Sequence, residues 1–233
     1  SRKLTEIQLE HQSKILEGVS KATTALLLED DTHSAINKAF EYIGNASGVD
    51  RVYLFEYHND ESGNEDILIS QRYEWCGPGT SPQIDNPDLQ NLPADFIPRW
   101  NELLAAGESV VGFVKDFPDN EREILEPQEI ISLLVVPVFV ENRLFGFVGF
   151  DDCSKAYAWT QSEVFILQSL ASAIGNALLR ERAAEKLKFS ENRFRVLYEE
   201  SPIGLMLSEY DGTIINTNEA FRKILSCANP VPV

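Results

Sequence analysis

Two stretches near the start of the chain repeat apolar residues at intervals of three and four, which indicates one apolar face of an α-helix. The second stretch spans about 33–46, with Asp31 and Thr32 as candidate N-caps and Gly44 and Gly48 as candidate stops. The first spans about 3–28 and carries Leu4, Ile7, Ile15, Val19, Ala22 and Leu26 on its apolar face. We expect two consecutive helices.

An alternating pattern follows and predicts a pair of strands. In 51–57 (RVYLFEY), Tyr53, Phe55 and Tyr57 share one face of the strand, and Val52 and Leu54 share the other. A polar turn at 59–66 separates this strand from a returning one at 67–75. The next stretch, 76–93, contains four prolines and two glycines and predicts a long loop. Long loops in compact domains are usually functional covers or mobile segments.

Shorter elements occupy the middle of the chain. We expect a helix at 96–106, a strand at 109–114 and a second short helix at 119–125. Two apolar runs, Ser132–Val140 and Leu144–Phe150, flank the polar break Glu141-Asn142-Arg143, which predicts a β-hairpin.

A long helix is predicted at 160–198, where Thr160 and Glu163 have the spacing of an N-terminal capping box. Its first part can cover a sheet through Val164, Leu167, Leu170, Ile174, Ala177 and Leu178. The stretch 180–188 is mostly charged, and a seam of apolar residues close to heptad spacing (170, 174, 177, 184, 187) runs through it. This pattern indicates a coiled-coil-like connector.

The last segment, 200–233, has a different organisation. Ser201-Pro202-Ile203-Gly204 breaks the helix, a hairpin with an Asp211-Gly212 turn follows, and a helix is expected at 219–225. Two strands and a helix cannot bury a core by themselves. We therefore expect the chain to be a fragment of a longer multidomain protein.

Composition narrows the classes of function. Apolar residues make up 43% of the 233 positions, which is enough for a packed core. The formal charge of −17 repels phosphate backbones and anionic lipids, so we expect neither nucleic-acid binding nor membrane contact. No uninterrupted apolar run approaches the ~18 residues of a membrane span, and no signal peptide is recognisable. Three widely spaced cysteines suggest no disulfide framework, so a cytoplasmic location is expected.

The order of elements, together with Ser132–Val138 and Gly146-Phe147-Val148-Gly149-Phe150-Asp151, resembles a GAF domain. Ser201-Pro202-Ile203-Gly204, Asp211-Gly212 and the segment Ile214–Phe221 resemble the opening of a PAS domain. The resemblance implies an α+β fold with a central antiparallel sheet, helices on one face and a loop-covered pocket on the other. It divides the chain into an N-terminal signalling helix (1–30), a GAF domain (31–180), a helical linker (181–199) and a truncated PAS N-terminus (200–233).

The pocket of such a fold lies between the sheet and the loop side. Aromatic side chains often line pockets for flat ligands, although most aromatic stripes are core packing. We predict that loop 76–93 and helix 96–106 cover a cavity lined by some of Tyr53, Phe55, Tyr57, Trp75, Trp100, Phe113, Val135 and Asp151.

Several other functions have weaker support. The Cys-His pair expected of a bilin-binding GAF domain is absent. His11, His33 and His58 lie in poor places for a haem ligand, and Cys76 or Cys153 is a less favoured alternative. A cysteine-dependent GAF reductase would need Cys76 and Cys153 close together with a depressed thiol pKa. No catalytic or metal-binding motif emerges, and the cofactor stays unknown.

We therefore expect a sensory module of a signal-transduction protein of the histidine kinase or diguanylate cyclase type. A small molecule, or a neighbouring domain, would bias the pocket, and dimeric helices would relay the change to PAS and output domains. The helices at 3–28 and 160–198 are expected to lie on the same side of the sheet and to pair two copies of the chain. A haem or other prosthetic group in the pocket is the alternative.

Overall fold

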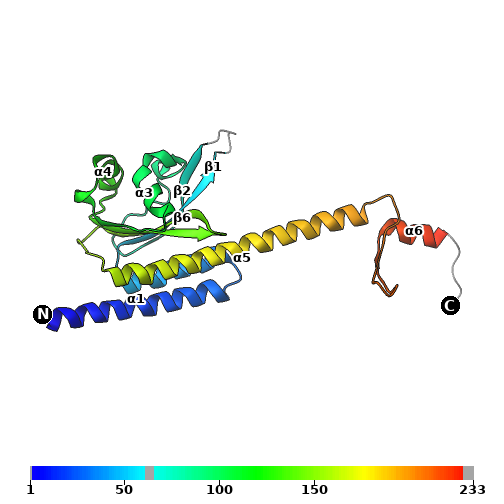
Figure 1. Ribbon diagram of the computed structural model, residues 1–233, viewed down its shortest axis with the longest axis horizontal. Helices are drawn as coiled ribbons and strands as arrows, with labels where there is room; N and C mark the ends of the chain where they lie inside the picture. Colours follow the sequence, from blue (N-terminus) through cyan, green and yellow to red (C-terminus); the bar gives the residue numbers. More distant parts are fainter. Residues whose placement is uncertain (1, 61–65, 228–233) are drawn as a thin grey trace. The chain divides into compact units, whose positions relative to one another are not determined.

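The computed structural model describes residues 2–60 and 66–227 of the chain, and residues 61–65 of the predicted polar turn lie outside this description (Figure 1). The chain divides into two compact units, Ser1–Leu179 and Arg180–Val233, which are described separately.

A six-stranded sheet with the order β3-β2-β1-β6-β5-β4 forms the centre of the first unit, and its paired strands are antiparallel. The strands are β1 (Arg51–Asn59), β2 (Ile67–Cys76), β3 (Leu92–Pro93), β4 (Val110–Phe113), β5 (Ser132–Val140) and β6 (Arg143–Asp152). The predicted hairpin is β5 and β6. Its turn residues Glu141 and Asn142 have φ angles of 51° and 61°, as a two-residue type I′ turn requires.

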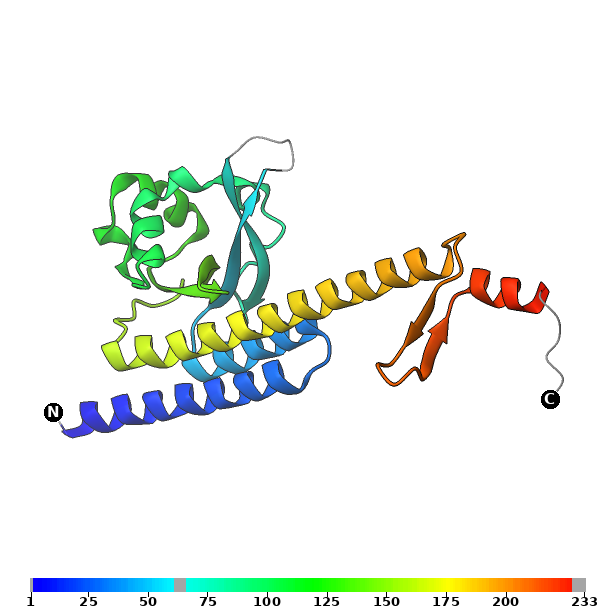
Figure 2. The same ribbon diagram turned by 45° about the vertical axis from the view of Figure 1, so that its right-hand side comes forward.

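Three helices cover one face of this sheet (Figures 1 and 2). They are α1 (Arg2–Leu28), α2 (Thr32–Ser47) and the first part of α5 (Gln161–Glu199). Asp31 caps α2 by accepting a hydrogen bond from the Ser34 amide at 2.7 Å, and Gly48 ends it with a φ of 69°. Of the two candidate stops, only Gly48 ends α2, and the helix continues through Gly44. The placement of α1 and α5 on the same side of the sheet is confirmed, because both contribute to one core with α2.

Shorter elements cover the opposite face. These are the 3-10 turns Pro87–Leu89 and Ala94–Phe96, helix α3 (Pro98–Ala105), the 3-10 turn Val114–Asp116, helix α4 (Asp119–Leu125) and the 3-10 turn Glu126–Gln128. Alternation along β1 separates the two cores: Val52 and Leu54 face the three helices, whereas Tyr53 and Phe55 face the shorter elements. The predicted α+β architecture is confirmed.

The second unit contains the end of α5, the hairpin β7 (Met206–Ser208) and β8 (Ile214–Thr217), and helix α6 (Glu219–Cys227). Asn218 is fully buried and joins these elements. Its amide nitrogen donates to the Tyr198 and Ile203 carbonyls at 2.9 Å, and its oxygen accepts from the amides of Leu205 and Phe221. Many apolar side chains of this unit stay exposed, among them Ile203, Ile214, Ile215, Ile224 and Leu225.

One helix among the described residues, α5, is long and apolar enough by length and composition to cross a membrane, which the search for uninterrupted apolar runs did not indicate. Half of the qualifying window is buried within the structure. A helix packed against a sheet passes the same test, and Leu167, Leu170 and Ile174 are fully buried here. The window therefore gives only weak support for a membrane span.

Candidate functional site

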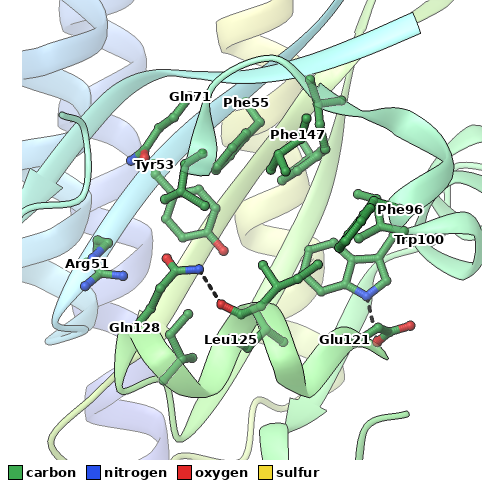
Figure 3. A pocket seen from close by; sticks show the side chains of 16 residues that line it. Arg51, Tyr53, Phe55, Gln71, Phe96, Trp100, Glu121, Leu125, Gln128 and Phe147 are labelled. Atoms are coloured by element: carbon green, nitrogen blue, oxygen red, sulfur yellow. Dashed lines mark hydrogen bonds between the residues drawn. The ribbon is translucent and has the colours of Figure 1, made fainter. Parts of the chain in front are cut away.

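A pocket lies between the sheet and the shorter elements, where β1, β2 and β6 form the floor and α3, α4 and the 3-10 turns form the roof (Figure 3). Its lining is predominantly apolar. The residues are Arg51, Tyr53, Phe55, Ile69, Gln71, Leu89, Leu92, Phe96, Ile97, Trp100, Glu121, Ile124, Leu125, Gln128, Ile130 and Phe147.

The pocket is narrow. The centres of water-sized molecules can occupy about 50 Å³ of it, which is room for a few waters. Deep hydrophobic walls with a small number of polar groups are typical of small-molecule sites. In this conformation the pocket suits a compact ligand, and a larger one requires the roof to move.

Aromatic rings make up much of the wall. Phe55 and Phe147 are stacked with their centroids 5.2 Å apart, and Trp100 meets Phe147 edge to face at 5.9 Å. Tyr53 packs edge to face on Phe55 at 5.5 Å. These flat surfaces can pack on a ring of a ligand.

A buried carboxylate holds the roof together. Glu121 of α4 accepts hydrogen bonds from Arg99 Nε at 2.7 Å and Arg99 Nη2 at 2.5 Å, and from Trp100 Nε1 at 2.9 Å. The bidentate pair and the indole donor fix α3 against α4. The Tyr57 hydroxyl donates to Asn101 Oδ1 at 2.6 Å and ties α3 to the sheet.

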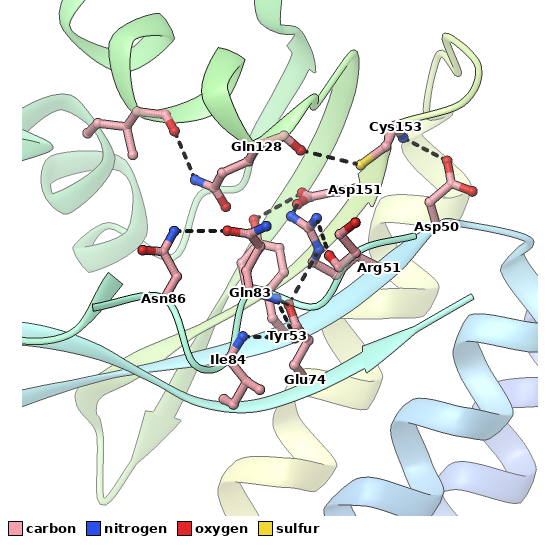
Figure 4. A network of polar contacts seen from close by, with 12 residues as sticks. Asp50, Arg51, Tyr53, Glu74, Gln83, Ile84, Asn86, Gln128, Asp151 and Cys153 are labelled. Carbon is pink, nitrogen blue, oxygen red and sulfur yellow. Dashed lines mark hydrogen bonds and ion pairs between the residues drawn. The ribbon is translucent and has the colours of Figure 1, made fainter. Parts of the chain in front are cut away.

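A second polar network lies at the Arg51 end of the pocket (Figure 4). Arg51 is buried between two carboxylates, with Nε 3.4 Å from Glu74 Oε1 and Nη1 3.5 Å from Asp151 Oδ2. The Tyr53 hydroxyl donates to Asp151 Oδ1 at 3.0 Å. Glu74 also accepts hydrogen bonds from the amides of Gln83 and Ile84, and so fixes the loop between β2 and β3.

Burial controls the protonation of these groups. The pKa of Asp151 rises to about 7 because the side chain is buried, although Arg51 and the Tyr53 hydroxyl oppose the shift. Burial raises the pKa of neighbouring Asp152 to about 7 as well. The pKa of Tyr53 lies well above its usual value because of burial and the neighbouring Asp151 carboxyl.

The structure places the predicted site residues in several positions. Three of them, Tyr53, Phe55 and Trp100, line the pocket. Tyr57 and Val135 pack in the core of the same layer, and Asp151 lies fully buried behind Tyr53. Phe113 borders a separate hollow with Val114 and Ile131.

Trp75 is on the opposite face of the sheet from the pocket, which corrects its predicted place in the lining. It packs with the α1, α2 and α5 core, and a Cβ atom at Gly44 of α2 would lie 2.2 Å from its ring carbons. The indole therefore fills the space left by a glycine of a covering helix.

The remaining lining residues have only weak signals in the sequence. Phe147 was visible as an apolar strand residue within Gly146–Asp151, but its role as the central ring of the aromatic wall depends on its register with Phe55. The roof residues Leu89, Leu125 and Ile130 come from short turns, which have no usable periodicity. Arg51 and Gln71 are single polar residues in strands.

The described histidines and cysteines do not fit a prosthetic group in this pocket, because none of them is among its lining residues. His58 bonds Ser70 Oγ at the far end of β1, and His33 packs on Tyr73. Burial raises the pKa of the Cys76 thiol to about 11 and that of Cys153 to about 12. Both shifts oppose thiolate formation, which a cysteine-based reductase needs.

The pocket wall is connected to the start of α5 by hydrogen bonds. Asp152, the residue after Asp151, accepts from Ser132 Oγ at 3.4 Å, and Ser132 Oγ accepts from the Tyr157 amide at 2.9 Å. The Tyr157 hydroxyl donates to Glu163 at 2.7 Å. The predicted capping box is confirmed, since Glu163 accepts from the Thr160 amide at 2.8 Å and the Glu163 amide donates to Thr160 Oγ1 at 3.4 Å.

Among the described residues, no group of three or more histidine, cysteine, aspartate or glutamate side chains has the arrangement of a metal site.

Comparison with known proteins gives a consistent result. The GAF domain family model matches residues 31–178. The methanogenesis regulatory histidine kinase FilI of Methanothrix harundinacea (strain 6Ac) is 39% identical over 184 residues, which are 78% of this chain. The chain spans about a fifth (20%) of the length of that relative.

Solved structures share the fold. One is the far-red-absorbing dark state of a protein with bound biliverdin IXα, with a TM-score of 0.59 and 17% identity over 70% of this chain and 98% of the other. Another is a phycocyanobilin-bound GAF domain from a cyanobacterial phytochrome, with a TM-score of 0.56 and 19% identity over 74% of this chain and 96% of the other. At these identities the likeness concerns the fold alone.

Proposed function

The chain belongs to the GAF domain family, and on that premise we propose that it is the sensory module of a signal-transduction protein whose pocket binds a small molecule. The observation that carries the proposal is the aromatic pocket between β1, β2, β6 and the roof of α3 and α4. Its wall is continuous with the strand that leads into α5, so a change at the pocket has a short covalent and hydrogen-bonded route to that helix.

The mechanism needs two states of the module, one of which the ligand prefers. A ligand that displaces the Tyr53 ring changes the hydrogen bond to Asp151 and the position of the β6 end. The segment 153–160 then transmits the change to the Tyr157–Glu163 contact at the start of α5. Helix displacement of this kind is a common output of sensory domains.

The second unit is proposed to be the beginning of a PAS domain. This proposal agrees with the hairpin, the helix and the buried Asn218 that hydrogen-bonds to several of these elements. The exposed apolar side chains of the unit require further packing partners. Similarity to a regulatory histidine kinase supports a kinase as the output, with a cyclase as the alternative. We place the module in the cytoplasm, because its three widely spaced cysteines suggest no disulfide framework. Its acidic composition favours contact with neither nucleic acid nor anionic membranes.

Dimerisation through the terminal helices is part of the proposal. Ile7, Leu9 and Leu16 of α1 are exposed, as are Leu187 and Phe194 of α5. Leu9 and Leu16 are seven positions apart, and so are Leu187 and Phe194, which is the spacing of a helical pairing face. A second copy of the chain would cover these side chains.

Native mass spectrometry of the purified chain tests ligand binding. We expect a non-covalently bound small molecule, and we expect it to be lost in Leu125→Trp, which fills the pocket from the roof. Leu27→Trp adds the same ring at an exposed position of α1 and is the matched control. Hydrogen exchange of residues 157–178 should differ between the ligand-bound and emptied protein. An empty wild-type pocket together with unchanged exchange in Leu125→Trp would contradict the proposal.

A further inference from the structure

The charged residues of the pocket wall already have partners. Glu121 is paired with Arg99 and hydrogen-bonded by Trp100, and it is only 1% exposed. Arg51 is 2% exposed and lies between the carboxylates of Glu74 and Asp151. A charged ligand would therefore bring an unpaired charge into an apolar space, which is costly.

Among the described residues of the wall, Gln71 is the one uncharged polar side chain with a buried, unpartnered atom. Arg51 Nε and Nη1 make no hydrogen bond either, but they lie 3.4 and 3.5 Å from the carboxylates of Glu74 and Asp151. The Gln71 side chain is buried, with 3% of its surface exposed, and its Oε1 atom accepts no hydrogen bond from the described residues. Gln71 lies on β2 opposite Phe55 of β1, beside the aromatic wall. An unsatisfied buried acceptor costs free energy, and a bound group with an N–H or O–H removes that cost.

The other glutamine of the wall provides a contrast. Gln128 also lines the pocket, but its amide nitrogen donates to the Ile124 carbonyl at 2.9 Å (Figure 3). Its side chain is thus held by the roof. Gln71 differs in offering a vacant acceptor next to the stacked rings of Phe55 and Phe147.

We propose that the pocket takes an uncharged, flat molecule with one hydrogen-bond donor, and that Gln71 recognises the donor. This inference rests on the proposed sensory function and assigns the chemical class of its ligand. The aromatic wall packs on the ring, the paired carboxylates and guanidinium groups reject ions, and Gln71 separates donor-bearing molecules from hydrocarbons of the same shape.

Binding of four single-ring probes, followed through the Trp100 indole resonance by NMR, tests the inference. The probes are p-cresol, its isostere p-xylene, 4-methylbenzoate and 4-methylbenzylammonium. The proteins are wild type, Gln71→Met and Gln128→Met. We expect the affinity ratio of p-cresol to p-xylene to fall about tenfold in Gln71→Met, the size of one lost hydrogen bond to a buried group. The ratio should be unchanged in Gln128→Met, and both ions should bind at least about tenfold more weakly than p-cresol.

Thermal unfolding supplies a second readout. Gln71→Met removes an unpaired buried polar atom and should unfold at the same temperature as wild type or higher. A large loss of stability would show a structural role for Gln71 and overturn its assignment as a recognition residue.

The negative outcomes of the probe-binding experiment overturn different parts of the proposal. Equal responses of p-cresol and p-xylene to Gln71→Met would overturn the role of Gln71, while the pocket remains a ligand site. Tight binding of either ion would overturn the exclusion of charge. Failure of every probe, with no molecule retained in native mass spectrometry, would remove the ligand class and count against the sensory pocket itself.

Discussion

The ring of Tyr53 occupies the space that a side chain at Gly149 would fill. The two residues are register partners on β1 and β6, and a Cβ atom at Gly149 would lie 2.0 Å from Tyr53 Cζ and 2.3 Å from its hydroxyl oxygen. The glycine lets the ring lie flat over β6 and reach Asp151. The Tyr53 ring approaches the β6 backbone so closely at this position that only glycine fits there.

Gly149→Ala should therefore destabilise the protein, by about 1–3 kcal/mol as is typical of overpacking. Alanine normally stabilises a strand relative to glycine, so a loss isolates the clash. Chemical denaturation measures it, and Gly77→Ala is the control because a Cβ there makes contacts no closer than 3.5 Å. In the Tyr53→Ala background the penalty should shrink. Equal penalties in both backgrounds would contradict the explanation.

The first strand and the hairpin were predictable because their residues alternate or form unbroken apolar runs. Tyr53 and Phe55 share a face in the sequence and in the structure. Trp75 is predicted in the pocket only because it is one of several aromatic residues of the sheet and its cover. Strand β2 has a register irregularity: Leu54 pairs with Tyr73 and Phe55 with Gln71, so Arg72 is an extra residue. One inserted residue reverses the faces. Gln71 therefore lines the pocket, and Trp75 packs on α2.

The roof was less predictable. Its contacts join residues that are far from the strands in sequence, and Leu89, Leu125 and Ile130 come from elements of a few residues. Pairings such as Glu121 with Arg99 and Trp100 depend on how two short helices meet. Local sequence patterns carry no such information.

Loss of the Glu121 carboxylate should loosen the roof. Glu121→Ala leaves the Trp100 Nε1 donor buried without its partner, which costs about 1–3 kcal/mol. Arg99 is partly exposed and can turn to water, so the cost should stay below that of breaking a fully buried ion pair. Urea unfolding gives the free energy, and Glu123→Ala, an exposed neighbour on α4, is the control. A loss of unfolding free energy no greater than that of the control would refute the role of Glu121 in joining α3 to α4.

Stability should fall as pH rises toward about 7. The folded-state pKa of Asp151 is raised to about 7, whereas an unfolded aspartate titrates near about 3.9, so the folded protein binds more protons between these values. The stabilisation is complete below the unfolded pKa and is lost as pH rises through the folded one. One such proton corresponds to at most about 1.4 kcal/mol per pH unit.

Urea denaturation from pH 4.5 to 8 of wild type and Asp151→Asn measures this effect. The stability of wild type should fall more steeply with pH than that of Asp151→Asn. Part of the slope should persist in the variant because the pKa of Asp152 is also raised. Asp116→Asn, at an exposed position, should leave the slope unchanged. Parallel curves for wild type and Asp151→Asn would refute the raised pKa.

Glu163 should stabilise the first turn of α5 and connect it to α1. Its fully buried carboxylate accepts hydrogen bonds from Tyr157 and Thr160, and its Oε1 lies 3.7 Å from His11 Nε2 of α1. Glu163→Ala removes all of these contacts and should cost more than Thr160→Ala, for which the loss of a cap predicts about 1 kcal/mol. Hydrogen exchange should increase in 157–165 and also around His11, with exposed Ser162→Ala as the control. Exchange that increases only in α5 would refute a link to α1.

The terminal helices should pair two copies of the chain. The predicted seam at 170, 174 and 177 does not serve this role, because those side chains are buried in the core of one copy. Leu187 and Phe194, in the part of α5 that belongs to the second unit, are 60% and 55% exposed and are spaced by one heptad. Burial of such side chains in a symmetric interface would stabilise a dimer.

Sedimentation equilibrium at ~100 μM, well above micromolar dissociation constants, should detect this dimer. The double substitution Leu187→Glu/Phe194→Glu should shift the population toward monomer. Lys188→Gln/Arg195→Gln changes the net charge equally and has the same spacing, yet removes no apolar side chain, so it should leave the dimer intact. A wild-type chain that is strictly monomeric at this concentration would remove helix pairing from the mechanism, and equal weakening by both double substitutions would assign the association to charge rather than to these side chains.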